Sequence, residues 1–213
     1  MGRGTSASSA RHRAEADVEF ARIVAFSDGV FAIAITLLVL ALEIPPHVPD
    51  LGDALREHAN ALFAYALSFA VLGKLWLAHH RFFSSLERFD GTLMALNLLY
   101  LAWVALVPFT SEVLGDYSGE PEGVIVYAAS MTGVSLTFGI GIVYAYRRDL
   151  VSPEYRGLER RFAGPANFLV PAVFAASIPV ALVSTTVATV MWLAIFVIGR
   201  RTGDLIAGRP HPM

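Results

Sequence analysis

Apolar residues occur along this chain in long blocks that are separated by short polar segments. Six blocks approach or reach the length of about 20 residues that a helix needs to cross a bilayer core of about 30 Å. The pattern therefore predicts an all-α membrane protein with six transmembrane helices per subunit. We expect these helices at about 22–44, 58–80, 92–114, 124–146, 165–183 and 185–201.

The composition supports a membrane protein over a soluble one. Of the 213 residues, 55% are hydrophobic and 16% are charged, whereas soluble domains carry about 25% charged residues. One domain is expected for this length: a polar N-terminal arm at 1–21, a six-helix domain at 22–201 and a polar tail at 202–213. A net charge of −2 argues against nucleic-acid binding, and the lack of cysteine excludes disulfides, thiolate metal sites and catalytic thiols.

The distribution of Lys and Arg predicts the orientation in the membrane. Fourteen of the sixteen basic residues lie at the same side of the predicted helices: in the N-terminal arm and the first residue of the first helix, in the connections after the second and fourth helices, and in the end of the sixth helix with the tail. Basic residues are enriched on the cytoplasmic side. Both termini are therefore expected to be cytoplasmic, which an even number of helices allows.

Polar residues inside the first three helices are expected to form one layer near the cytoplasmic side. Asp28 lies six residues beyond Arg22, or about 9 Å deeper along the helix axis. Lys74 and Asn97 have similar depths in the second and third helices, and Ser27 adjoins Asp28. A charge at this depth must be paired or hydrated.

We expect Asp28 to find its partners among four residues of this layer, namely Arg22, Lys74, His79 and Asn97. Two roles are compatible with the layer. It is either a clamp that only fixes helix packing, or a clamp that also takes part in gating.

The first helix also carries an apolar stripe. At about 100° per residue its members lie within about 40° of their mean direction, and Thr36 flanks them. Such a stripe packs against lipid or in a helix seam, or, if several copies surround an axis, forms stacked apolar rings that gate by dewetting. Its members are Phe26, Gly29, Ile33, Leu37, Leu40 and Ile44.

No pattern in the sequence indicates an enzyme, a metal site or a cofactor. The Gly-x-Ser-x-Gly, His-Glu-x-x-His and P-loop motifs do not occur. His79 and His80 are adjacent and point about 100° apart on a helix, so they do not chelate a metal as an i, i+4 pair does. Trp76 is most simply a packing or membrane-interface residue.

These residues resemble a known family, the transmembrane protein 175 potassium channels in their bacterial branch. The first helix contains Arg22-x-x-x-Phe26-Ser27-Asp28-Gly29, which is similar to the first-helix signature of that family. Two further segments are similar to the second and third helices of that family: Trp76-x-x-His79-His80-Arg81-Phe82, and Asn97-Leu98-Leu99-Tyr100 through Pro108-Phe109.

The resemblance implies a homotetramer in the bacterial plasma membrane, in contact with lipid, that conducts potassium passively and with modest selectivity over sodium. It implies that the first helix lines a central pore narrowed by Ile33, Leu37 and Leu40, with Thr36 beside the narrow point. It further implies that Arg22, Ser27 and Asp28 brace this helix, with His79 and Asn97 as partners. Lys74 is not part of the motif, and its role is left open.

Two other functions are considered. A cation- or proton-coupled secondary transporter needs a carboxylate near mid-membrane, and Asp28, the one acidic candidate, lies off-centre. A non-conducting membrane scaffold would carry no flux.

Overall fold

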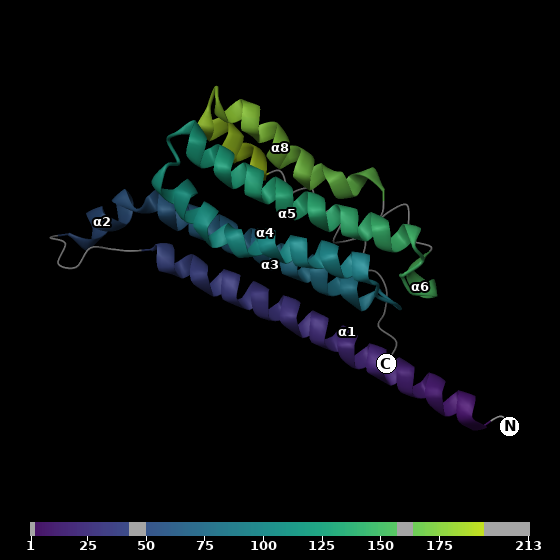
Figure 1. Ribbon diagram of the computed structural model, residues 1–213. Coiled ribbons are helices and arrows are strands. Elements are labelled where there is room, and N and C mark those ends of the chain that lie inside the picture. Colours follow the sequence, from purple (N-terminus) through teal and green to yellow (C-terminus); the bar gives the residue numbers. More distant parts are fainter. Residues whose placement is uncertain (1–2, 43–49, 157–163, 194–213) are drawn as a thin grey trace.

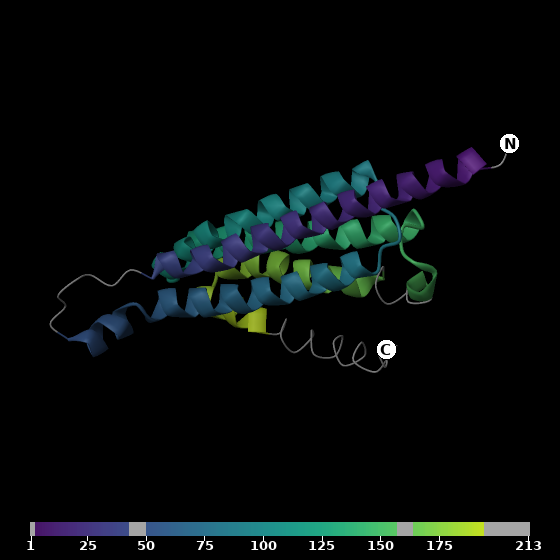
Figure 2. The same cartoon turned by 90° about the horizontal axis from the view of Figure 1, so that it is seen from below.

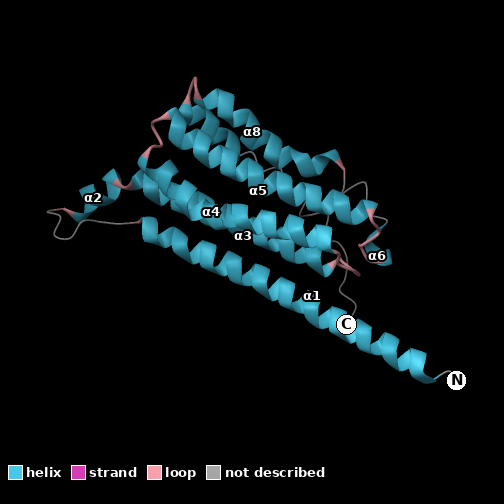
Figure 3. Ribbon diagram, viewed as in Figure 1, coloured by secondary structure: helices cyan, strands magenta, loops and turns pink. Residues whose placement is uncertain are grey.

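Helices make up nearly all of the protein that the computed structural model describes, which is residues 3–42, 50–156 and 164–193 (Figure 3). Residues 185–193 are helical and follow a turn at 182–183. The remaining elements, in chain order, are α1 (Arg3–Leu37), the 3-10 helix η1 (Leu38–Ala41), α2 (Leu51–Glu57), α3 (Ala59–Ser84), α4 (Gly91–Asp116), α5 (Pro121–Arg147), α6 (Pro153–Arg156), the 3-10 helix η2 (Pro165–Phe168) and α8 (Leu169–Ala181).

Four helices of the described residues are long and apolar enough to cross a membrane. They are Val18–Ala41, α3, α4 and α5. The predicted fifth span, 165–183, consists of η2 and the shorter apolar helix α8, which has 13 residues. Residues 194–201 of the predicted sixth span lie outside the described residues, so the count of six remains a prediction.

The first helix begins well before the predicted span. α1 starts at Arg3 and continues unbroken into the apolar block. Alanine, the strongest helix former, recurs between residues 7 and 21, which favours a helix there in spite of the polar composition. The N-terminal part of α1 projects beyond the other helices (Figure 1, Figure 2).

The helices pack in successive layers. α1 packs on α3 and α4, α4 packs on α5, and α5 packs on α8 (Figure 1). α5 is therefore covered on two sides, and more than half of its apolar window is buried. One continuous core cluster runs from α1 through to Trp192 in the last described helix.

The connections after α3 and α5 pair with each other. Leu86 and Val151 form an isolated antiparallel bridge. The Glu87 amide donates to the Leu150 carbonyl at 2.8 Å, and the Ser152 amide donates to the Ser85 carbonyl at 2.9 Å. These bonds join the ends of α3 and α5 at the same end of the bundle.

Asp90, in the connection between α3 and α4, links α4 to α5. Its carboxylate caps α4 by accepting from the Leu93 amide at 2.8 Å and also accepts from the Tyr144 hydroxyl at 2.8 Å. Burial alone would raise the pKa of Asp90. The bonds from Leu93, Tyr144 and the Thr92 amide, with the charge of Arg148, outweigh burial and hold this pKa below its ordinary value.

Replacement of Asp90 by alanine is expected to lower the free energy of unfolding by about 1 kcal/mol, the usual cost of losing a helix N-cap. Thermal denaturation in detergent measures the change. Because the pKa of Asp90 is lowered on folding, the stabilisation is complete above about pH 4 and is lost as the pH falls through the lowered pKa. Tyr144→Phe removes one of the bonds and is expected to have a smaller effect. Equal melting temperatures for Asp90→Ala and the wild type would contradict the assignment.

Candidate functional site

One face of α1 and η1 is buried against α3 and α4. Its residues recur at three- and four-residue spacing, as a helix face requires, and each is at most 2% exposed. They are Ser27, Phe31, Ala34 and Leu38. Apart from Ser27 this face is apolar. Residues 30–38 are therefore held against α3 and α4 mainly by apolar packing.

The opposite face of α1 is not covered by the other residues that the structure describes, and we call it the uncovered face. Its large apolar side chains are 42% to 65% exposed. A Cβ atom at Gly29 would meet no other atom within 4 Å. The residues of this face are Arg22, Phe26, Gly29, Ile33, Thr36, Leu37 and Leu40. The structure therefore places all four residues of the predicted constriction on one open surface.

The helix changes its winding next to the constriction residues. Thr36 Oγ1 donates to the Ile33 carbonyl at 2.9 Å, and the α-helix gives way to the 3-10 helix η1 at Leu38. In a 3-10 helix the side chains of residues i and i+3 lie directly above each other. Leu37 and Leu40 therefore lie close to one line on the uncovered face.

A hydrogen-bonded layer ties the inner part of α1 to α3 and α4. Asn97 Nδ2 donates to Ser27 Oγ at 3.0 Å, and His79 Nε2 lies 2.9 Å from Asn97 Oδ1. Ser27 Oγ donates in turn to the Ile23 carbonyl at 2.9 Å. The structure thus brings Ser27, His79 and Asn97 together from three helices.

The direction of these bonds assigns the proton of His79. Ser27 gives its hydrogen to the Ile23 carbonyl, so it accepts from the amide nitrogen of Asn97. The amide oxygen of Asn97 then faces His79, whose Nε2 must carry the hydrogen. Each of the three side chains makes at least one hydrogen bond, which is the usual condition for placing polar groups in an apolar interior.

Asp28 is bound by Trp76, which was not among its four expected partners. Trp76 Nε1 donates to Asp28 Oδ1 at 2.9 Å, whereas Asn97, an expected partner of Asp28, donates to Ser27. Trp76 lies one turn before His79 on α3, so both reach α1 from the same side. This three-residue spacing was the available signal for Trp76 as a partner of Asp28.

Arg22 and Lys74 are the other two predicted residues of the layer. Arg22 is exposed on the uncovered face, about one turn before Phe26. Lys74 is half-buried on α3. The bonds described above therefore join Ser27, Asp28, Trp76, His79 and Asn97.

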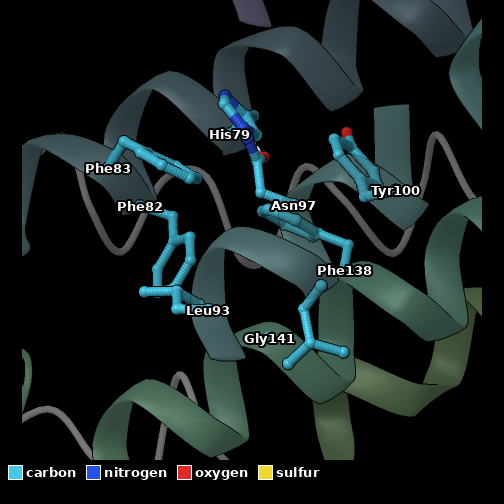
Figure 4. Close-up of a pocket in the computed structure, with 9 residues that line it drawn as sticks. His79, Phe82, Phe83, Leu93, Asn97, Tyr100, Phe138 and Gly141 are labelled. Carbon is cyan, nitrogen blue, oxygen red and sulfur yellow. Dashed lines mark hydrogen bonds between the residues drawn. The ribbon is translucent and has the colours of Figure 1, made fainter. Parts of the chain in front are cut away.

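Aromatic rings enclose His79 (Figure 4). Its ring stacks on Phe83 at a centroid distance of 4.2 Å and on Tyr100 at 5.5 Å, and Phe31 and Phe138 lie within 6.4 Å. The cavity beside these rings has a volume of about 10 Å³, which holds one water molecule at most. The surroundings of His79 are thus those of a packed support and not of a substrate pocket.

A metal-binding group is also not found in the part of the chain that the structure describes. There, no three His, Asp or Glu side chains are close enough to hold a metal ion.

The sequence of this chain matches known proteins over its first helices. The family model described as the endosomal/lysosomal potassium channel TMEM175 matches residues 22–108. A potassium channel of Streptomyces collinus is 42% identical over 126 residues, which cover 56% of this chain and 61% of that protein. A potassium channel of Chamaesiphon minutus is 39% identical over 127 residues, which cover 56% of this chain and 63% of that protein. The chain thus spans under two thirds of the length of these relatives.

The fold matches a solved structure over nearly the whole of that protein. The crystal structure of a lysosomal potassium-selective channel TMEM175 homolog from Chamaesiphon minutus has a TM-score of 0.74 and 28% sequence identity. The match covers 87% of this chain and 98% of that one. The buried and uncovered faces of α1 therefore belong to an all-helical membrane channel fold.

Proposed function

We propose that this chain, which is similar to the bacterial TMEM175 potassium channels, conducts potassium passively through a pore lined by α1. The proposed channel is a homotetramer of six-helix subunits in the cell membrane, with both termini in the cytoplasm. Ions would cross it without a coupled substrate and without a cofactor.

The observation that supports this proposal best is the uncovered face of α1. Ile33, Leu37 and Leu40 are exposed, although α1 is firmly packed on its other side. An exposed apolar stripe of this kind needs lipid or other protein to cover it. With four copies of α1 around one axis, the three side chains would become three stacked apolar rings.

The proposed rings would control conduction by controlling water. A narrow apolar ring empties of water, and a dry segment blocks a hydrated ion. Conduction then requires the side chains to move outward until a partly hydrated ion fits. The sequence contains no TVGYG segment to replace the hydration shell with carbonyl oxygens. Selectivity for potassium over sodium would therefore follow from ring width and dehydration cost, and would be modest.

The hydrogen-bonded layer of Ser27, Asp28, Trp76, His79 and Asn97 is called the inner layer below. Its proposed role is to set the angle of α1. Ser27 and Asp28 are bonded to two different helices through Asn97 and Trp76. Bonds in two directions restrict both rotation and tilt of the helix. Because the constriction residues lie further along the same helix, the inner layer would set the diameter of the rings.

A flux assay with purified protein in liposomes tests this function. Potassium flux that rises in proportion to concentration, with slower sodium flux, is the expected result. A saturable rate coupled to sodium or to protons would indicate a secondary transporter. A proton ionophore added to the liposomes reveals coupling to protons. No flux of either ion would indicate a scaffold.

A further inference from the structure

A second buried polar cluster, which we call the hydroxyl chain, joins α3, α4 and α5. Ser68 Oγ lies 2.9 Å from Ser111 Oγ and 3.0 Å from the Tyr127 hydroxyl. All three residues are at most 3% exposed. None of them belongs to the three family motifs at 22–29, 76–82 and 97–109.

The direction of the hydrogen bonds follows from counting hydrogens. Ser111 donates to the Ala64 carbonyl at 3.2 Å, so it accepts from Ser68. Ser68 has one hydrogen and gives it to Ser111, so the Tyr127 hydroxyl must donate to Ser68. The hydrogen bonds therefore run in one direction from α5 through α3 and α4 to a backbone carbonyl, and each hydroxyl donates once.

The hydroxyl chain lies at the level of the proposed constriction. The inner layer joins Ser27, His79 and Asn97. The level of the hydroxyl chain is found by counting eleven residues along each helix away from this layer, which is about 16 Å. The count leads from Ser27 to Leu38 on η1, from His79 to Ser68 on α3, and from Asn97 to residue 108 on α4. Ser111 is one further turn along α4, in agreement with its bond to Ala64, one turn before Ser68 on α3.

Leu38 connects this level to the pore-lining face. It is 1% exposed and belongs to the same apolar cluster as Ala64, Leu67 and Val107. Its neighbours along the chain, Leu37 and Leu40, lie on the uncovered face. Apolar contacts let helices slide, whereas directional hydrogen bonds fix their register, so the hydroxyl chain determines where the surface that supports Leu38 lies.

We propose that Tyr127, Ser68 and Ser111 are positioning residues for ion selectivity, because they hold α3 and α4 in the register that sets the pore width at Leu37 and Leu40. This inference rests on the proposed channel function. Tyr127 is itself fixed from behind, since its ring lies 5.0 Å from that of Trp192, whose Nε1 donates to Ser177 on α8 at 2.9 Å.

The test compares the ratio of potassium to sodium flux in liposomes for single and double variants. Tyr127→Phe removes one donor and keeps the ring, and Ser111→Ala removes the bond to α3. One hydrogen bond corresponds to about a fivefold change in an equilibrium, so each variant is expected to lower the flux ratio by up to about fivefold. The double variant is expected to add little, because both changes break one chain.

The control variant is Thr132→Val, on α5 about one and a half turns beyond Tyr127. It removes a hydroxyl whose bond, to the Ala128 carbonyl at 2.7 Å, stays within α5. It is expected to leave the flux ratio unchanged, and melting temperatures report any loss of stability in all variants. Wild-type flux ratios in Tyr127→Phe and Ser111→Ala would overturn this inference alone. A wild-type protein without potassium flux would overturn the proposed function and this inference together.

Discussion

Replacement of Ile33 by asparagine is expected to raise cation leak through the protein by an order of magnitude or more. Ile33 is 61% exposed on the uncovered face, so the change opens no cavity in the subunit. Removing an isoleucine-sized side chain from apolar surroundings changes its transfer free energy by about 2 kcal/mol. A barrier lowered by that amount corresponds to roughly a thirtyfold increase in rate. Potassium and sodium flux into liposomes measures the leak.

The matched control places the same substitution on a helix that is not proposed to line the pore. Leu106 on α4 is 46% exposed, and Leu106→Asn is expected to leave the flux at the wild-type value. If Ile33→Asn also conducted at the wild-type rate in a protein that passes potassium, α1 would not line the conduction path.

Replacement of Asp28 by alanine is expected to impair tetramer assembly or gating. The variant leaves the Trp76 indole N–H without its acceptor inside the bundle. A hydrogen bond to a charged group contributes about 2 kcal/mol, which is roughly a thirtyfold change in the equilibrium that keeps α1 in place. Size-exclusion chromatography measures assembly, and single-channel recording measures gating.

Trp76→Phe separates the bond from the charge. It removes the donor and keeps both the aromatic volume and Asp28, so it is expected to change gating in the same direction as Asp28→Ala. The double variant is expected to resemble Asp28→Ala, because the two residues act through one bond. A normal tetramer with normal currents in Asp28→Ala would show that the inner layer plays no part in holding α1.

The sequence predicted the parts of the fold that depend on one helix at a time. Block length located α3, α4 and α5, because a bilayer imposes a minimum number of apolar residues. Block length overestimated the length of the α-helix within 165–183, because the 3-10 helix η2 precedes an α-helix of 13 residues there. It also missed the start of α1 at Arg3, because apolar periodicity gives no signal in a helix composed of alanine and polar residues.

The candidate site could be predicted from the sequence only as far as the depth of a polar residue along its helix determines which residues of other helices it contacts. Ser27 and Asn97, which the sequence places at similar depth, are hydrogen-bonded to each other. Depth does not determine which way a side chain points, so Trp76 was missed as the donor to Asp28. The hydroxyl chain had no signal at all, because single serines and tyrosines occur throughout apolar helices and only helix packing shows which of them meet.

The two opposite faces of α1 predict how the protein tolerates change. A library randomised at Phe31, Ala34 and Leu38 would yield mostly clones that fail to accumulate, because these side chains have no free space around them. A library randomised at Ile33, Leu37 and Leu40 would yield many well-expressed clones that differ in current. In the proposed channel, natural selection can therefore retune permeation on one side of a single helix while the architecture on its other side stays constant.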